Sequence, residues 1–320
     1  MTPNPEVLVV GGGPAGLAAA AAASAAGADV LLIDENSQLG GNLRYRVQPV
    51  APVDGEPPMP PAELREALIA GATDAGATLR PGVIAAGWYA GGKVLLVEGD
   101  AARVVTPERL IVASGSTDLP FPFAGATLPG VVTARAMQIL LNTWRVRPGE
   151  QFAVIGSSAE ASEVVIDIAV AGGEVVFHGV APAPLLKANG ASGVQEFWIG
   201  DERYDVQSVV IAMGRQPDAA LATMAGAELG FAPRLGGLIP RTTDLMQAAE
   251  RVFVAGDAAG VGSVAEAIAE GRIAGKGAAM SLGTVGAEEV MAAVAQGGEM
   301  FQRRAEARRD VQPVYSQPYL

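Results

Sequence analysis

The stretch from Val7 to Asp34, which reads VLVVGGGPAGLAAAAAASAAGADVLLID, constrains the fold of this chain more than any other. It starts with an apolar run typical of a buried parallel strand, and it ends with a second apolar run and an acid. Between the two runs, Gly11, Gly13 and Gly16 have the G-x-G-x-x-G spacing at the start of an alanine-rich helix. This continuous order of strand, glycines, helix, strand and acid predicts a dinucleotide-binding unit.

Each glycine of this turn has its own physical role. Gly11 permits the tight turn, Gly13 lets a pyrophosphate approach the backbone, and Gly16 lets the helix pack closely on the strand. The helix N-terminus directs N–H groups and the positive end of its dipole toward the phosphates. Asp34 can accept hydrogen bonds from a ribose diol. The alternative, an alanine-rich helix that binds nothing, does not account for this complete unit.

Composition limits the class of protein. The chain has 320 residues, which is enough for two domains, and half of them are hydrophobic. A net charge of -12 argues against a surface for nucleic acid or anionic membrane. There are no cysteines, which excludes a redox-active disulfide, a thiolate nucleophile and a cysteine-ligated iron-sulfur cluster. We predict no metal site, and we expect electrons to travel on a bound organic cofactor.

The N-terminal region indicates where the protein works. The lead MTPNPE has no cationic stretch, so we expect no cleavable signal peptide. The apolar run from Leu17 to Ile33 is interrupted by Gly27 and Asp29 and belongs to the nucleotide unit, so we expect no membrane insertion. These observations predict a soluble cytoplasmic protein.

A second copy of the pattern follows in the middle of the chain. Gln151–Ile155 reads as a strand, and Gly156, Ser158 and Ala161 occupy the three fingerprint positions. Serine at the second position places a side chain where a pyrophosphate would approach. The next strand ends at His178, the only histidine, rather than at an acid. The pattern supports a dinucleotide-type fold and leaves open whether NAD(P) binds there, and whether His178 is structural or touches a phosphate.

Two further segments end at a glycine. LIVASGS, from Leu110 to Ser116, reads as a buried strand whose end faces the ligand crevice of an open α/β sheet. RVFVAGDAAG, from Arg251, is a similar strand that ends at Asp257, before a helix from Ser263. An acid at that position either caps the helix or holds a polyol chain. Near the end of the chain, four arginines form a run typical of a solvated helix face, namely Arg303, Arg304, Arg308 and Arg309.

These landmarks together resemble the flavoproteins that have two dinucleotide-binding domains. Their order is similar to that of thioredoxin reductase, whose active-site cysteine pair is missing here. GGNLRYR and the segments LPFPFAGATLPGVVTARAMQILL and RPGEQFAVIGS resemble one set in particular. This set comprises the FAD/NAD-type subunits of sarcosine, opine, hydroxyproline and proline oxidoreductases and of hydrogen cyanide synthase. The likeness covers about Val7 to Ala279, most of the chain.

The resemblance implies an α/β fold of two Rossmann-like, thioredoxin-reductase-like domains, with a discontinuous FAD-binding domain at 1–117 and 237–320. The NAD(P)-type domain would occupy 118–236. FAD would be bound through Gly11, Gly13, Gly16, Asp34, Gly41, Asn42, Gly115 and Asp257, and we add their neighbours Pro14, Ala15, Glu35, Ser114, Gly256 and Ala265. Gly156 and Ser158 are the residues that would contact NAD(P) if it binds. No residue is assigned a catalytic acid-base role.

Three functions are consistent with this sequence. The first is an FAD-containing electron-transfer subunit of a heteromeric amine dehydrogenase or oxidase, whose partner subunit carries its own FAD and oxidises the amine. Several members of the set have a cysteine-rich iron-sulfur region, so in this case that relay is absent or lies on another polypeptide, such as a small iron-sulfur subunit. The second is a stand-alone NAD(P)H-dependent flavin reductase. The third is a scaffold subunit with a non-functional second nucleotide site.

Overall fold

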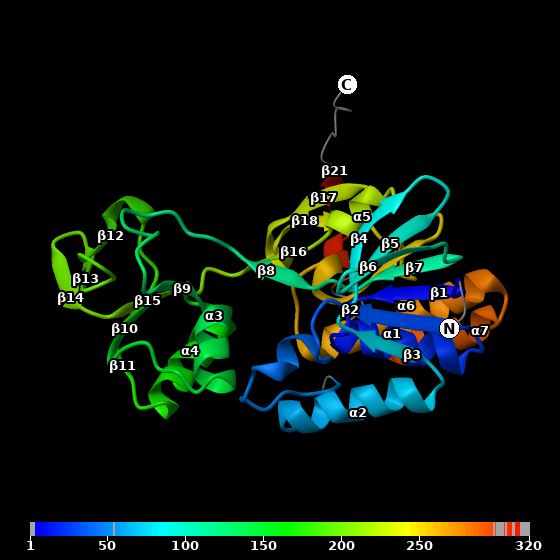
Figure 1. Ribbon diagram of the computed structural model, residues 1–320, viewed down its shortest axis with the longest axis horizontal. Coiled ribbons are helices and arrows are strands. Elements are labelled where there is room, and N and C mark those ends of the chain that lie inside the picture. The colour runs from blue at the N-terminus through cyan, green and yellow to red at the C-terminus, as the bar shows by residue number, and fades with distance from the viewer. Residues whose placement is uncertain are drawn as a thin grey trace. The chain divides into compact units, whose positions relative to one another are not determined.

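The computed structural model describes residues 4–53, 55–296, 298, 304, 306–308 and 311–313. The chain divides into two compact units (Figure 1). Unit 1 comprises Met1–Arg44, Pro49–Ser116 and Gln216–Leu320, and unit 2 comprises Tyr45–Gln48 and Thr117–Arg215. None of the helices in the described part of the chain has the length and apolarity needed to cross a membrane.

Unit 1 is built on a six-stranded sheet with the order β19-β20-β7-β1-β2-β3. Its strands are β1 (Val7–Val10), β2 (Val30–Asp34), β3 (Thr78–Pro81), β7 (Arg109–Val112), β19 (Gln247–Ala249) and β20 (Val252–Val254). All neighbouring pairs are parallel except β19 and β20. The carboxyl ends of β20, β7, β1 and β2 therefore meet at one edge of the sheet, where the ligand of such a sheet binds.

Helices and smaller sheets complete unit 1. The helices are α1 (Pro14–Ala25), α2 (Pro61–Asp74), α5 (Ala220–Met224), α6 (Val264–Leu282) and α7 (Ala287–Gln296), with short turns η1 (Gly41–Arg44), η4 (Pro233–Leu235) and η5 (Gly256–Ala259). One small antiparallel sheet contains β4 (Ile84–Tyr89), β5 (Lys93–Glu98) and β6 (Ala101–Val105). A second contains β17 (Leu229–Ala232), β18 (Gly237–Pro240) and β21 (Gln312–Pro313).

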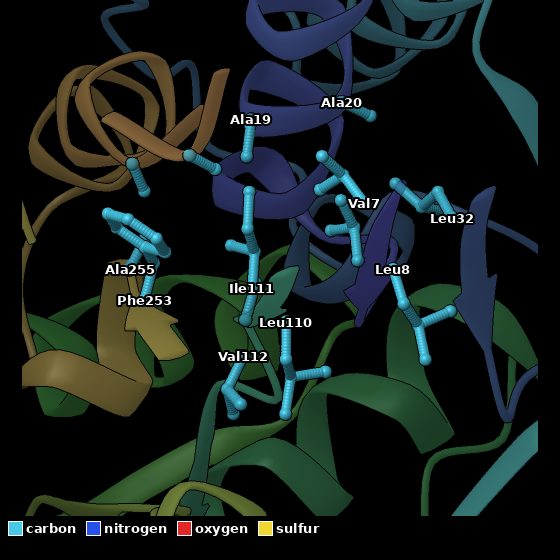
Figure 2. Close-up of a cluster of buried hydrophobic side chains, with 14 of the residues drawn as sticks. Val7, Leu8, Ala19, Ala20, Leu32, Leu110, Ile111, Val112, Phe253 and Ala255 are labelled. Carbon is cyan, nitrogen blue, oxygen red and sulfur yellow. The ribbon is translucent and has the colours of Figure 1, made fainter. Parts of the chain in front are cut away.

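The core of unit 1 follows from the alternation of side chains along the strands. Val7 and Ile111 point toward α1, while Leu8, Leu110 and Val112 point to the opposite face of the sheet (Figure 2). All of these side chains are buried in one hydrophobic cluster. The first strand, β1, is therefore covered on both faces, as a central parallel strand requires.

Small residues let α1 and α6 pack side by side on one face of this sheet (Figure 1). A Cβ atom on Gly271 would lie 2.1 Å from the carbonyl oxygen of Ala15. One turn further along, a Cβ atom on Gly275 would lie 2.3 Å from the carbonyl oxygen of Ala19. The two backbones are in direct contact, which fixes the first half of α1 against the middle of α6.

Unit 2 is built on a four-stranded parallel sheet with the order β11-β10-β15-β9. Its strands are β9 (Val131–Thr133), β10 (Gln151–Ile155), β11 (Glu174–Gly179) and β15 (Ser208–Ile211). The other elements are the helices α3 (Ala134–Gln138) and α4 (Ala159–Val170), the turns η2 (Ile139–Thr143) and η3 (Ala183–Leu185), and an antiparallel sheet of β12 (Leu186–Asn189), β13 (Glu196–Ile199) and β14 (Glu202–Asp205). The segments that join the units, β8 (Ser116–Asp118) and β16 (Arg215–Pro217), pair with each other.

The chain leaves unit 1 near the expected position and returns to it earlier than expected. Apart from the short excursion of Tyr45–Gln48 into unit 2, the chain crosses after Ser116 and returns at Gln216 rather than near Gly237. The segment between these two return positions contains α5, whose Leu221 and Ala222 are buried in the hydrophobic cluster of unit 1. This segment therefore folds with the first unit because its apolar residues fill that core.

Candidate functional site

Gly11 and Gly16 shape the turn that follows β1. Gly11 has a φ of +109°, and a Cβ atom there would lie 2.2 Å from the carbonyl oxygen of Ala113. A Cβ atom on Gly16 would lie only 1.8 Å from the carbonyl oxygen of Gly11. Both glycines are therefore required by the fold itself, since they let β1, β7 and α1 approach closely.

Gly13 is different, because its lack of a side chain serves no close contact within the protein. It is the N-cap residue of α1 with extended backbone angles, φ −79° and ψ −175°, and Pro14 follows in the first turn. A Cβ atom there would meet only Gly41 at 3.7 Å, an ordinary contact distance. The N-cap position of α1 thus offers no side-chain acceptor to its own helix, and the backbone here is open to an anionic ligand.

Asp34 connects the end of β2 to the glycine turn. Its Oδ2 atom accepts the backbone N–H of Gly12 at 2.7 Å, and its Oδ1 atom accepts the backbone N–H of Asn36 at 2.7 Å. The carboxylate is buried, whereas the neighbouring Glu35 is exposed. Asp34 therefore lies beside the turn, at the position from which an acid can reach a ribose.

The segment around Gly41 and Asn42 packs on the same turn. The N–H of Gly40 donates to the carbonyl of Gly12 at 2.7 Å, and η1 begins at the next residue. A Cβ atom on Gly41 would lie 2.9 Å from the Cα atom of Gly13. This segment is thus a short helical turn whose backbone contacts the open N-cap of α1.

Ser114 and Gly115 follow β7 at the same edge of the sheet. The hydroxyl of Ser114 donates to the carbonyl of Asp218 at 2.6 Å, and the carbonyl of Gly115 accepts the N–H of Asp218 at 2.9 Å. These bonds fix the strand end to the segment through which the chain returns to unit 1.

Gly256 and Asp257 follow β20. Gly256 has a φ of +70°, and a Cβ atom there would lie 2.6 Å from the Cβ atom of Ala15 in the first turn of α1. The carboxylate of Asp257 accepts the hydroxyl of Ser116 at 2.9 Å and the N–H of Gly262 at 3.1 Å. The segment that follows β20 is thus in contact with the first turn of α1.

Asp257 does not cap α6, so that interpretation of the sequence is wrong. The N-cap residue is Ser263, whose hydroxyl accepts the N–H of Glu266 at 3.2 Å while the Glu266 carboxylate accepts the N–H of Ser263 at 2.6 Å. This reciprocal pair is a capping box. Ala265 is buried in the same first turn. Asp257 instead binds Ser116 and the loop that precedes α6.

The basic run near the C-terminus is not a solvated helix face at the two arginines that the structure describes. Arg304 and Arg308 are buried and both bind the buried carboxylate of Glu270 in α6. Burial opposes the ionisation of Glu270, but the charges of Arg308 and Arg304 and their hydrogen bonds outweigh it and hold the pKa of this carboxyl below its ordinary value. Arg303 and Arg309 lie outside the described residues.

The corresponding turn of unit 2 is closed by its own side chains. Gly156 again allows close packing, because a Cβ atom there would lie 2.1 Å from the carbonyl oxygen of Ala212. Ser158, at the second fingerprint position, is the N-cap of α4, and its hydroxyl accepts the N–H of Ala161 at 3.2 Å. Glu160 lies in the first turn of the same helix.

Charges around Glu160 form a partly buried group in unit 2. Its carboxylate lies 3.7 Å from the guanidinium of Arg215. Burial raises the pKa of Glu160 above its ordinary value, although Arg215 acts in the opposite direction. His178 is exposed at the end of β11. An anion at this helix N-terminus would therefore meet a serine side chain and a carboxyl group.

The glycine turn, Asp34, Ser114, Gly115, Gly256 and Asp257 thus follow four neighbouring strands of unit 1, while Gly41 and Asn42 lie in η1 and Ala265 lies in α6. Gly156 and Ser158 form a separate turn in unit 2. An open glycine turn, a helix N-terminus without a side-chain cap and a buried acid fit the pyrophosphate and ribose of FAD. Within the described part of the chain, no group of three or more His, Cys, Asp or Glu side chains could hold a metal ion.

Comparisons with known proteins identify a matching family and several relatives. Residues 6–72 match the family described as FAD dependent oxidoreductase. The chain is 30% identical over 246 residues to the alpha subunit of sarcosine oxidase from Corynebacterium sp. (strain P-1), covering 72% of this chain and 24% of that protein. It is 27% identical over 333 residues to an opine oxidase subunit of Rhizobium meliloti (strain 1021), covering 87% of this chain and 71% of that protein.

Solved structures show the same fold. L-proline dehydrogenase from P. horikoshii superposes with a TM-score of 0.78 at 24% identity, covering 97% of this chain and 59% of that chain. Thioredoxin reductase of Lactococcus lactis superposes with a TM-score of 0.68 at 16% identity, covering 88% of this chain and 100% of that chain. The predicted Rossmann-like α/β fold is confirmed. The matched family and the relatives, which are oxidase subunits, support a flavin-dependent oxidoreductase with FAD as its cofactor.

Proposed function

We propose that this protein is the FAD-containing electron-transfer subunit of a heteromeric dehydrogenase or oxidase that acts on an amino acid or a secondary amine of the sarcosine, proline, hydroxyproline or opine type. The relatives support this, because they are subunits of a sarcosine oxidase and of an opine oxidase, and one solved structure with the same fold is a proline dehydrogenase. The chain spans only 24% of that sarcosine oxidase subunit, so its substrate class and partners belong to this proposal.

One observation carries the proposal, namely the contrast between the two helix N-termini. The N-cap of α1 is Gly13, which leaves the turn open to a pyrophosphate. The N-cap of α4 is Ser158, whose hydroxyl already accepts a helix N–H, and Glu160 adds a carboxyl group beside it. We therefore assign FAD to unit 1, and we regard unit 2 as an NAD(P)-type domain that does not bind a nicotinamide as hydride donor to the flavin. Electrons must then enter from a partner.

FAD, when bound, supplies the capacity to accept an electron pair and pass it on. In the proposed site, Gly13 leaves room for the pyrophosphate, Asp34 faces the ribose, and Asp257 faces the polyol chain of the cofactor. Both carboxylates also accept backbone N–H bonds, from Gly12 and Gly262 respectively, which orients them. These groups bind and orient, and none is assigned to remove a proton from an amine.

The proposed partner is an FAD-containing subunit that oxidises the amine. This chain has one histidine and no cysteine, so it offers few groups for acid-base chemistry and none for an iron-sulfur cluster. A small iron-sulfur subunit is the proposed carrier wherever such a relay is present. A cytoplasmic location stays a prediction.

An anaerobic reduction experiment tests the proposal. The purified chain is reconstituted with FAD, and the visible flavin band is recorded after addition of NADH, of NADPH, and then of the amine-oxidising subunit with sarcosine or proline. We expect the band to stay oxidised with either nicotinamide and to bleach when an amine and the partner subunit are both present. Full bleaching by NADH alone would instead identify the chain as a reductase.

The NAD(P)H-dependent flavin reductase is kept as a second candidate because unit 2 retains the β10–α4–β11 arrangement and the first glycine of the fingerprint, Gly156. Hydride transfer between nicotinamide and flavin needs little from side chains beyond orientation. The third candidate, a scaffold subunit with a non-functional second nucleotide site, predicts that neither a nicotinamide nor the amine with the partner subunit reduces the flavin of this chain, which separates it from the other two.

A further inference from the structure

Glu270 connects two segments of unit 1 that lie far apart in the sequence. It is buried in α6, and its Oε2 atom accepts the N–H of Gly256 at 3.0 Å. Its Oε1 atom accepts the Nε–H of Arg304 at 2.6 Å and also a hydrogen bond from Arg308. One carboxylate thus holds the first residue of η5 and two arginines near the C-terminus.

The two arginines in turn hold the loop that follows. Arg304 donates from Nη2 to the carbonyl of Gly260 at 2.5 Å and from Nη1 to the carbonyl of Val261 at 3.1 Å. Arg308 donates from Nε to the carbonyl of Ala259 at 3.1 Å. Three consecutive carbonyls are therefore bound by two guanidinium groups, whose planar forks fix the direction as well as the distance of each bond.

The loop held in this way, 256–262, is the one that contains Asp257. Gly262, at its end, donates its N–H to the Asp257 carboxylate at 3.1 Å. Arg304 lies directly against this residue, because a Cβ atom on Gly262 would be 2.1 Å from its Nη1 atom. The loop is thus bound by Glu270 at its beginning and by Arg304 and Arg308 along its second half.

The charges of this cluster argue against a purely stabilising role. Two buried guanidinium groups share one buried carboxylate, and Glu266 lies 3.5 Å from Arg304. Removing such ions from water costs free energy that their mutual attraction only partly returns, and apolar residues of the same volume often stabilise a protein as well or better. Apolar residues, however, could not bind the loop carbonyls.

We propose that Glu270, Arg304 and Arg308 are positioning residues of the FAD site, which hold the loop 256–262 so that Asp257 faces the cofactor. This inference rests on the assignment of Asp257 to the FAD site in the proposed function. If the inference holds, FAD affinity depends on Arg304 and Arg308, which lie in a segment near the C-terminus that contains none of the residues assigned to FAD.

The first test measures FAD affinity in full-length variants that keep the positive charge of an arginine but lose its planar guanidinium group. Arg304→Lys and Arg308→Lys are compared with Arg241→Lys, whose partner Glu228 lies at 3.5 Å in an exposed pair. FAD is removed, and the dissociation constant is measured by the change of flavin fluorescence on rebinding. We expect Arg304→Lys to weaken FAD by about 10- to 100-fold, since it loses charge-assisted bonds to the loop, and Arg241→Lys to leave affinity unchanged.

A double-mutant cycle separates positioning from general destabilisation. If Arg304 acts through Asp257, the loss of affinity in Arg304→Lys/Asp257→Asn is smaller than the product of the two single losses by about threefold or more. A residue that only stabilises the fold gives losses that multiply. If Arg304→Lys does not fold, Gly262→Ala replaces it in the cycle. The Cβ atom of the new alanine would lie 2.1 Å from the Nη1 atom of Arg304 and so displaces this arginine from the loop 256–262.

The outcomes are distinct. Unchanged FAD affinity in folded Arg304→Lys and Arg308→Lys, or multiplicative losses in the cycle, would overturn the positioning role while leaving the proposed function intact. Unchanged affinity in Asp257→Asn alone would overturn both the assignment of Asp257 and the inference built on it. Neither outcome depends on a partner subunit, so failure of the electron-transfer proposal is measured separately.

Discussion

The Cα atom of Gly41 lies 3.7 Å from the position that a Cβ atom on Gly13 would occupy, so Gly13 is a glycine that the apoprotein itself does not need. Gly16 is the opposite case, with the carbonyl oxygen of Gly11 only 1.8 Å from its hypothetical Cβ atom. The two glycines of one fingerprint are thus needed for different reasons: Gly13 for the proposed cofactor and Gly16 for the packing of the fold. Substitutions can separate these constraints.

Gly13→Glu should abolish FAD binding and leave the apoprotein folded. Its backbone has extended angles that any residue adopts, while the new side chain and charge would occupy the space of the pyrophosphate. We expect a colourless protein whose thermal midpoint matches that of wild-type apoprotein. Gly71→Glu, at an exposed helix position with open space around it, is the charge-matched control and should stay yellow. A yellow, fully loaded Gly13→Glu protein would refute the assignment.

Gly16→Ala should destabilise the apoprotein itself. The added methyl group forces α1 away from the Gly11 carbonyl, and overpacking of this kind costs about 1–3 kcal/mol or more. Gly71→Ala, within α2, meets no atom within 4 Å and should stabilise by about 0.5–1 kcal/mol. Urea unfolding of both variants without FAD measures the difference. Equal midpoints for the two would show that the turn can relax.

The sequence predicted the parts of the site that depend on local pattern. Apolar runs followed by glycines or acids identified the strand ends that carry Gly11, Asp34, Gly115 and Asp257, and the parallel topology brought these ends to one edge. The capping box S-x-x-E of Ser263–Glu266 was also present in the sequence, and it would have removed the capping interpretation of Asp257.

The role of the C-terminal arginines could not be predicted in the same way. Arg304 and Glu270 are separated by 34 residues, and nothing in the local spacing of either distinguishes a buried ion pair from a solvated charge. The early return of the chain to unit 1 could not be predicted for the same reason. The short helix α5 belongs to unit 1 because Leu221 packs in the core of that unit. Tertiary contacts, rather than local propensity, determine both features.

Asp257→Ala should weaken FAD more than the loss of its internal hydrogen bonds explains. The substitution removes the acceptor for Ser116 and Gly262 as well as the proposed contact with the polyol chain. Ser116→Ala removes the first of these bonds and keeps the carboxylate. We expect affinity to fall about 10- to 100-fold in Asp257→Ala and much less in Ser116→Ala. Equal, small effects in both would leave Asp257 with a role in the loop alone.

The Glu270 cluster predicts a specific response to acid. The pKa of Glu270 is lowered in the folded protein, so its contribution to stability is complete above the unfolded value of 4.5 and is lost as pH falls through the lower folded value. Glu270→Gln should be less stable at neutral pH by about 3–5 kcal/mol, because two buried arginines lose their partner. The unfolding free energies of wild type and variant should converge as pH falls, whereas a constant gap from pH 7 to about 3 would contradict the prediction.

Ser158 and Glu160 predict how nucleotide binding could be introduced into unit 2. Ser158→Gly restores the second glycine of the fingerprint and costs only a few tenths of a kcal/mol as a helix cap, while Glu160→Gln removes a carboxyl group from the helix N-terminus. The double variant should bind NADH more tightly than wild type, measured by quenching of NADH fluorescence. Ser162→Ala, at an exposed position in the same helix, is the control and should bind NADH as wild type does. If the double variant binds no better than this control, some other feature of unit 2 excludes the nucleotide, and the closed N-terminus of α4 is not its cause.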